Sequence, residues 1–258
     1  MPSYFESWNS YWAFSQAVRF RSRFLHDDVV KAFLQAITDS TEKRSVVLTP
    51  GKVVCRAQLG HDWRKRNQAG ISWDEPIPFS AERMKPLRNS ALEGRVNPRG
   101  IPCLYAANNE KTAIAEVRPW VGALVSVAQM RPVHELRLVD CSDGHEATFD
   151  LHIEEPPPEI REGVVWREIG RAFSSPVSTN PGIAEYVPTQ ILAEHFRKQG
   201  YDGVHYKSKL GPGYNIAVFD LAALEVVKLG LFPIESVDYK IGEEQDSYFI
   251  RHPHQPGK

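Results

Sequence analysis

The spacing of the strand-like segments is the feature that most constrains the fold of this chain. From Arg44 onward, short runs of β-branched and aromatic residues follow one another, and most of the gaps between them hold no helical pattern. Parallel neighbours in a sheet need a long crossover connection, whereas antiparallel neighbours need only a turn. We therefore predict an α+β fold with a mostly antiparallel sheet and flanking helices.

The first strand-like segment, SVVLTPGKVVCRAQL, is interrupted by Pro50-Gly51 and marks the start of the main body of the chain. Further strands are expected at residues 101–107, 123–130, 135–140, 204–208, 215–219 and 224–231. Residues 60–99 are polar, basic and without strong periodicity. Because stretches of this length without secondary structure are uncommon and often functional, we expect an irregular lid over a ligand there.

Helical patterns lie mainly before and between these strands. Large apolar residues recur at helical intervals in residues 4–24, and a second helix is expected from Asp27 or Asp28. Further helices are expected from Asn108 or Asn109 to Pro119, after prolines 156–158, and at residues 189–199 before Gly200. We divide the chain into a helical extension (1–45), one domain (46–235) and a tail (236–258) whose end we expect to be disordered.

Charge and cysteine content narrow the function classes. Lys and Arg number 31 against 32 Asp and Glu, a balance that does not favour nucleic acid or an anionic membrane as the main partner. The 3 cysteines show no C-x-x-C spacing, so reduced, buried thiols are expected. No secretory signal and no apolar run of about 20 residues is present. We expect a soluble, cytoplasmic protein.

Several well-known site motifs are absent from the sequence. It contains no G-x-G-x-x-G, no G-x-x-x-x-G-K-[ST], no H-E-x-x-H, no G-x-S-x-G and no zinc-type spacing of His and Cys. We expect neither a metal nor a resident cofactor. Arg21 and His26 do form the R-x4-H spacing of HEPN ribonucleases. That interpretation is disfavoured, because HEPN domains are helical bundles and fewer than about fifty residues here look purely helical.

The most informative stretch is EGRVNPRGIPCLYAANNEKTAIAEVRPWVGALVSVA, residues 93–128. A basic, Gly- and Pro-rich loop leads into a strand, and a capped helix then carries Glu116 among small apolar residues. A carboxylate in such surroundings costs free energy unless it is paired or functional. The residues alone leave both explanations open, and an ion pair with Arg118 or another arginine is the simpler one.

This stretch closely resembles the core of the RES (Arg–Glu–Ser) domain. The resemblance rests on G-R-x-N-P-x-G-I-P-x-L-Y-x-A, followed by T-A-x-A-E-V-R-P. VVCRAQ upstream, and YVPTQILAEHFRKQGYDGVHYKS and GYNIAVF downstream, extend it from about Val53 to Phe219. RES domains resemble ADP-ribosyltransferase toxins in fold. The resemblance therefore implies a split, mostly antiparallel sheet around an NAD cleft.

The resemblance also assigns roles to individual residues. The catalytic residues would be Arg56, Glu116 and Ser208, with Tyr105 and Arg95 binding NAD. Glu116 would stabilise the ribosyl cation that forms as nicotinamide leaves. Arg56 and Arg95 would grip the pyrophosphate or an incoming phosphate with forked hydrogen bonds. Tyr105 would stack on the nicotinamide ring, and Ser208 would fix the amide or ribose by a hydrogen bond.

By this resemblance the chain is a toxin-type enzyme that cleaves the nicotinamide–ribose bond of NAD+, its substrate, with water or phosphate as acceptor. ADP-ribosyl transfer to a protein is the alternative enzymatic function, and a non-catalytic interaction module is the non-enzymatic one. The implied partner is a separate antitoxin with a helix-turn-helix, without direct binding of nucleic acid or membrane by this chain. The acceptor, the antitoxin, a homo-oligomeric state and the role of the first 45 residues stay open.

Overall fold

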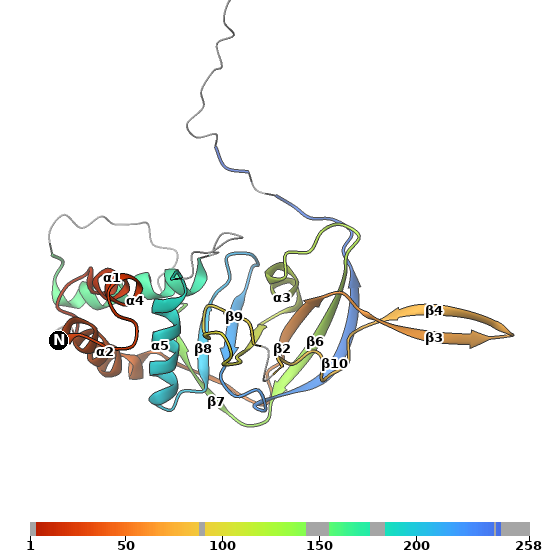
Figure 1. The fold of residues 1–258 in the computed structure, drawn as a ribbon, viewed down its shortest axis with the longest axis horizontal. Helices are drawn as coiled ribbons and strands as arrows, with labels where there is room; N and C mark the ends of the chain where they lie inside the picture. The colour runs from red at the N-terminus through yellow and green to blue at the C-terminus, as the bar shows by residue number, and fades with distance from the viewer. Residues whose placement is uncertain (1–3, 88–90, 143–154, 176–183, 240, 244–258) are drawn as a thin grey trace, which may run out of the picture.

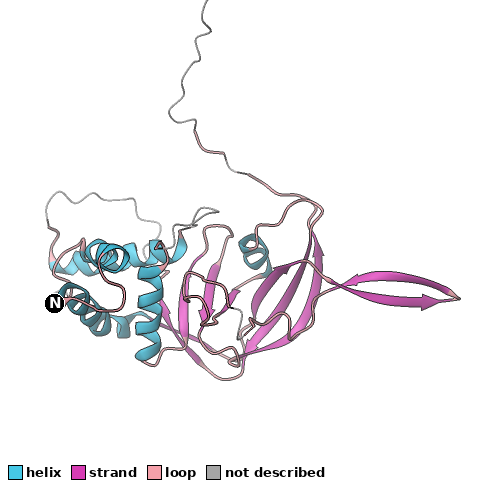
Figure 2. Cartoon of the chain, in the orientation of Figure 1, coloured by secondary structure: helices cyan, strands magenta, loops and turns pink. Residues whose placement is uncertain are grey.

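The computed structural model describes residues 4–87, 91–142, 155–175, 184–239 and 241–243. Its main sheet contains eight strands: β1 (Ser45–Leu48), β2 (Val54–Leu59), β5 (Leu104–Ala107), β6 (Leu124–Pro132), β7 (Leu136–Asp140), β8 (Gly203–Lys207), β9 (Tyr214–Val218) and β10 (Leu224–Pro233). Their order is β1-β7-β8-β9-β5-β2-β6-β10. Figure 1 draws the strands as arrows, and Figure 2 colours them magenta. The predicted α+β fold with a mostly antiparallel sheet is confirmed.

One pair of strands, β7 and β8, is parallel. Two helices, α4 (Pro158–Ser174) and α5 (Val187–Lys198), lie between them in the sequence. This is the long crossover that a parallel pair requires. The remaining pairs in the sheet are antiparallel, in agreement with the short gaps in the sequence.

The sheet is split near its middle. β5 and β2 are neighbours, but only Cys55 and Ala107 are in register between them. By comparison, β2 is paired with β6 from Val54 to Leu59, and β5 with β9 from Leu104 to Ala107. One half, β1-β7-β8-β9-β5, therefore meets the other half, β2-β6-β10, at a narrow junction. We call this junction the seam.

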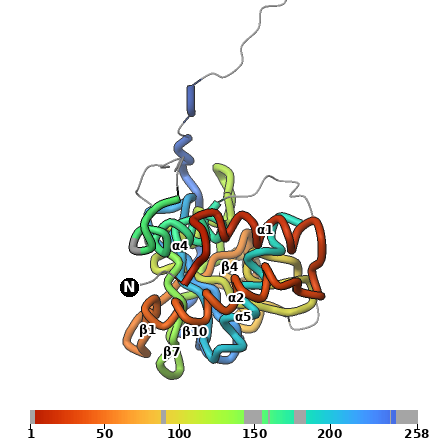
Figure 3. Tube along the Cα trace, turned by 90° about the vertical axis from the view of Figure 1, so that its left-hand side faces the viewer, coloured from red at the N-terminus to blue at the C-terminus, as the bar shows by residue number. Residues whose placement is uncertain are grey.

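Helices cover one face of the larger half-sheet. α1 (Ser10–Phe20) and α2 (Asp28–Thr41) pack with α4 and α5 at one end of the molecule (Figures 1 and 3). Their apolar side chains share one buried cluster with the sheet, which includes Phe14, Ile37, Trp166, Phe196 and Val204. Residues 4–45 thus contribute to the same core as the helices of the main body.

The ends of the expected helices agree with the structure in most places. Asp27 caps α2 and accepts a hydrogen bond from Val30 N (3.0 Å), and Asn109 caps α3 (Glu110–Glu116) in the same way. Gly200, with φ of 85°, follows the C-cap of α5. The helix expected at residues 4–24 is shorter in the structure, where α1 spans only Ser10–Phe20.

The expectation of an irregular stretch at residues 60–99 is wrong for its first part. β3 (Asp62–Gln68) and β4 (Ile71–Ile77) form a hairpin that projects from the body (Figure 1). Ala69 and Gly70, both with positive φ, make its turn. Nearly all its side chains are exposed. With solvent on both faces, neither strand needs alternating polarity, which is why the sequence pattern did not reveal it.

The chain after the hairpin returns to the body. Phe79 and Met84 are buried in a second cluster on the other face of the sheet, together with Leu104 and Leu138. The Phe79 amide donates to Ser126 Oγ (3.0 Å), which attaches this segment to β6. The end of the tail for which the sequence predicts disorder, residues 251–258, lies outside the described residues. Among the described helices, none has the length and apolar character needed to cross a bilayer.

Candidate active site

Two adjoining cavities lie along the seam. The first, of about 650 Å³, lies between β2, β5, α3 and the loop at residues 94–95. The second, of about 720 Å³, is bordered by the segments at residues 80–87 and 91–97. Both cavities are lined by Arg56, Gln58, Gly94 and Tyr105. Because they share these four residues, we refer to the two cavities together as the seam cleft.

Glu116 lies at the end of α3 and borders the first cavity. Its Oε1 accepts two hydrogen bonds, from Ser208 Oγ at 2.7 Å and from Asn215 Nδ2 at 2.6 Å. No ion pair of the described residues involves Glu116, so the Arg118 pairing does not occur. Both donors are neutral, and they orient the carboxylate without cancelling its charge.

Ser208 is buried at the turn between β8 and β9. Its Oγ accepts from the amides of Leu210 (3.1 Å) and Gly211 (2.9 Å) while it donates to Glu116. A hydroxyl has one proton and two lone pairs, so its hydrogen-bonding capacity is filled. The resemblance implies a direct hydrogen bond from Ser208 to the substrate. In this geometry the hydroxyl has neither a free proton nor a free lone pair for such a bond. Ser208 instead holds Glu116.

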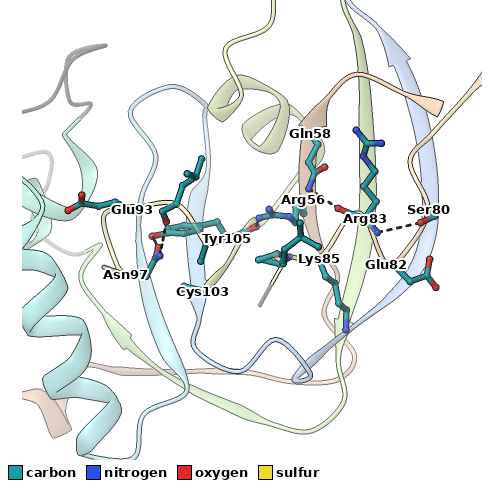
Figure 4. A pocket seen from close by; sticks show the side chains of 15 residues that line it. Arg56, Gln58, Ser80, Glu82, Arg83, Lys85, Glu93, Asn97, Cys103 and Tyr105 are labelled. Atoms are coloured by element: carbon teal, nitrogen blue, oxygen red, sulfur yellow. Dashed lines mark hydrogen bonds between the residues drawn. The ribbon is translucent and has the colours of Figure 1, made fainter. Parts of the chain in front are cut away.

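Arg56 crosses the seam. It belongs to β2, and its Nη1 donates to the main-chain oxygen of Tyr105 on β5 (2.8 Å), as Figure 4 shows. Its Nε is buried without a hydrogen-bond partner among the described residues. Burial lowers the pKa of the guanidinium. Arginine nevertheless stays charged at neutral pH, so Arg56 presents a cation to both cavities.

The loop that carries Arg95 is held firmly against the cleft. Gln190 of α5 donates to the main-chain oxygens of Gly94 (2.9 Å) and Asn97 (3.2 Å), and Thr189 Oγ1 donates to that of Arg95 (2.7 Å). A Cβ on Gly94 would lie 2.6 Å from Tyr105 Oη, so only glycine fits this approach. The loop is therefore a rigid wall of the cleft.

Tyr105 fastens the same loop through its hydroxyl. Tyr105 Oη donates to Asn97 Oδ1 (2.7 Å) and accepts from the amide of Val96 (2.9 Å). Burial raises the pKa of this phenol well above its ordinary value, which keeps it a neutral donor. With its hydroxyl engaged, only the ring of Tyr105 is left to contact a ligand.

Arg95 and Glu116 border the first cavity with opposite charges, and Tyr206 lies close to both. Arg95 donates to the main-chain oxygen of Phe173, and its guanidinium carbon lies 5.9 Å from the centre of the Tyr206 ring. Burial raises the pKa of the Tyr206 phenol; the Arg95 charge opposes this rise and the Glu116 charge adds to it. The cavity thus offers both an anion and cations to one ligand.

All five site residues that the resemblance assigns come together here. Arg56, Arg95, Tyr105 and Glu116 line the first cavity, and Ser208 is bonded to Glu116. The sequence reasoning missed Asn215, which is 7% exposed and bonded to Glu116. A signal was present in NIAVF, where Asn215 is the one polar residue of an apolar run.

The R-x4-H pair, Arg21 and His26, does not line the seam cleft. Arg21 forms an ion pair with Asp27 (3.5 Å), and His26 borders a separate cavity beside α5. The α+β fold is not the helical bundle of a HEPN ribonuclease. In the part of the chain that the structure describes, no group of three or more His, Cys, Asp or Glu residues is placed to hold a metal ion.

Comparison with known proteins agrees with the sequence resemblance. The profile of the RES domain matches residues 56–240, well over half of the chain. A search of curated proteins found no match. Among solved structures, the crystal structure of the M. tuberculosis MbcT–MbcA toxin–antitoxin complex contains a similar chain, at 13% identity and a TM-score of 0.43. The alignment covers 76% of this chain and 92% of that one. From the profile match, this chain belongs to the RES-domain family.

Proposed function

We propose that this protein is a toxin-type enzyme that degrades NAD+ by cleaving the bond between nicotinamide and ribose. The acceptor is water or phosphate. Support comes from membership of the RES-domain family and from the charges of the seam cleft. A separate antitoxin chain, which the family resemblance implies, completes the proposal.

The observation that carries the proposal is the carboxylate of Glu116, held by two neutral donors at the edge of a cavity. When the bond to ribose breaks, its electron pair leaves with the nicotinamide nitrogen, and positive charge passes to the ribose. An oriented carboxylate stabilises that charge most strongly in the transition state. An arginine partner on Glu116 would have opposed this effect, and the structure has an amide and a hydroxyl there instead.

Two cations in the same cleft suit the rest of the substrate. Arg56 and Arg95 each use one group to bind a main-chain oxygen, and both line the first cavity. Their remaining N–H groups can donate to the pyrophosphate, which needs several donors. The Tyr105 ring offers an apolar face to the nicotinamide. In this proposal Arg56 therefore both bridges β2 and β5 across the seam and binds phosphate.

The proposal is tested by incubating the purified chain with NAD+, with and without inorganic phosphate, and identifying the products by mass. Hydrolysis gives nicotinamide and ADP-ribose, whereas phosphorolysis gives nicotinamide and ADP-ribose 1″-phosphate. Transfer to a protein would give nicotinamide and a mass increase on a polypeptide. NAD+ that stays intact under all conditions would show that the proposal is wrong.

A further inference from the structure

We infer that Asn215 is a positioning residue for Glu116, the second member of a pair of neutral donors that fixes the catalytic carboxylate. The inference rests on the proposed function and adds a residue outside the Arg–Glu–Ser set. Asn215 Nδ2 lies 2.6 Å from Glu116 Oε1. The side chain is almost fully buried and also borders the first cavity.

The two donors bind the same oxygen. Ser208 Oγ and Asn215 Nδ2 both donate to Oε1 of Glu116, and no hydrogen bond to its Oε2 is found among the described residues. Two bonds on one oxygen fix the carboxylate group more firmly than a single bond would. Because Glu116 lines the first cavity, its second oxygen is the one we expect to bind the ribose.

Asn215 is anchored more rigidly than Ser208. It belongs to β9 and is in register with Ala107 of β5 on one side and with Tyr206 of β8 on the other. Ser208 lies on a turn whose geometry depends on the hydrogen bonds from Leu210 and Gly211. The sheet therefore fixes one donor and the turn supplies the other.

The chemistry of the amide also matters. Asparagine donates without carrying charge, so it orients Glu116 and leaves the negative charge intact. Aspartate has nearly the same shape but cannot donate when ionised, and it would place a like charge beside Glu116. The pair Asn215→Ala and Asn215→Asp therefore separates loss of volume from loss of the donor.

We expect Asn215→Ala to lower kcat for nicotinamide release by roughly 10- to 100-fold, the value of a hydrogen bond to a charged group, with a smaller change in KM. Asn215→Asp should lose at least as much at pH 8. Its kcat relative to wild type should rise as the pH is lowered, because the new carboxyl group and Glu116 then share a proton that restores a donor. Asn67→Asp, on the exposed strand β3, is the matched control and should leave kcat unchanged.

A double-mutant cycle distinguishes positioning from general damage. If Asn215 acts through Glu116, then Asn215→Ala should cost no more than about 3-fold in a Glu116→Gln background. The inference would be overturned if Asn215→Ala lowered kcat as much in the Glu116→Gln background as in the wild type. It would also be overturned if folded Asn215→Ala had a normal kcat. In both cases the proposed function would still stand.

If the wild-type protein does not consume NAD+, the contact between Asn215 and Glu116 can still be tested by NMR without substrate. The side-chain amide resonance of Asn215, assigned by its loss in Asn215→Asp, should shift when Glu116 is changed to Gln. The amide resonance of Asn67 serves as the reference and should not move. An unmoved Asn215 resonance would show that the contact is not formed in solution, whatever the outcome with NAD+.

Discussion

The seam cleft and the β3–β4 hairpin are both rich in charged and aromatic residues, but they hold their charges in different ways. On the hairpin, Arg64 and Arg66 both reach Glu75, at 3.0 and 2.7 Å. Their hydrogen bonds, that of Arg66 first, lower the pKa of Glu75. All three side chains are substantially exposed, and ion pairs of this kind contribute little to stability. The charges of the hairpin compensate one another in solvent.

In the first cavity of the seam cleft the charges are held by neutral groups. Glu116 is bonded to a hydroxyl and an amide, while Arg56 and Arg95 are bonded to main-chain oxygens. Among the described residues none of these three makes an ion pair. Placing uncompensated charges in a partly buried site costs stability unless a ligand of complementary charge uses them. This difference separates a binding site from a solvated surface better than the number of charges does.

The largest effect is expected when the charge in the cleft is removed. Glu116→Gln keeps the size of the side chain but removes its negative charge. We expect kcat for nicotinamide release to fall on the order of 10²–10³-fold, because one electrostatic contact to the transition state is lost. Binding of intact NAD+ should weaken much less. Turnover is measured by nicotinamide release and binding by calorimetry.

The matched control for this change lies on the same helix. Glu110, at the start of α3, accepts a hydrogen bond from Gln129 Nε2 (2.9 Å) and does not line the cleft. Glu110→Gln should leave kcat nearly unchanged. If the folded Glu116→Gln variant turned over at the normal rate, the mechanism would be wrong. An equal loss of binding and turnover would make Glu116 a ground-state ligand instead.

An intermediate effect is expected from two glycine substitutions, one in each region. A Cβ on Gly211 would lie 2.7 Å from Cα of Thr112, an atom of α3 that has little freedom to move. Gly211→Ala should therefore lower the free energy of unfolding by about 1–3 kcal/mol. It should also lower turnover, because the Gly211 amide donates to Ser208 Oγ.

Gly70→Ala is the counterpart on the hairpin. Gly70 has φ of 79°, and a Cβ added there would meet no heavy atom within 4 Å beyond its chain neighbours. The cost is therefore backbone strain of about 1–2 kcal/mol at the hairpin tip. This strain should not reach the core or change turnover. Both variants are compared by urea unfolding and nicotinamide release. If the two variants lost turnover equally, the hairpin and the seam cleft would be coupled.

Much of the fold could be predicted from the sequence because its local signals agree with its tertiary structure. The caps at Asp27 and Asn109 and the inner face of α2 follow directly from residue type and spacing. The hairpin could not be predicted, because strands exposed on both faces need no alternation of polarity. Burial in the core produces the polarity pattern that sequence reasoning relies on, whereas nearly all side chains of the hairpin are exposed.

For the candidate site, the family motifs identified five residues that lie together, but they did not reveal which contacts each residue makes. Two main-chain amides donate to Ser208 Oγ and occupy both of its lone pairs. This arrangement depends on the conformation of the turn at residues 208–213, which residue type alone does not determine. The contact between Asn215 and Glu116 joins residues 99 positions apart, and only the strand order brings them together.

The smallest effect is expected from shortening the hairpin. Replacing residues 65–74 with Asn-Gly would keep Arg64 opposite Glu75 and close the strands with a two-residue turn. A two-stranded hairpin has little stability of its own, and the removed residues make no extensive contacts with other elements. We expect the free energy of unfolding to change by no more than about 0.5 kcal/mol. We also expect nicotinamide release to stay within about 2-fold of wild type, since no residue of β3 or β4 lines the cleft. Urea unfolding and initial rates at several NAD+ concentrations provide the measurement. A large rise in KM with unchanged stability would contradict this expectation. It would mean that the hairpin closes over the bound substrate, and that its charges serve the cleft after all.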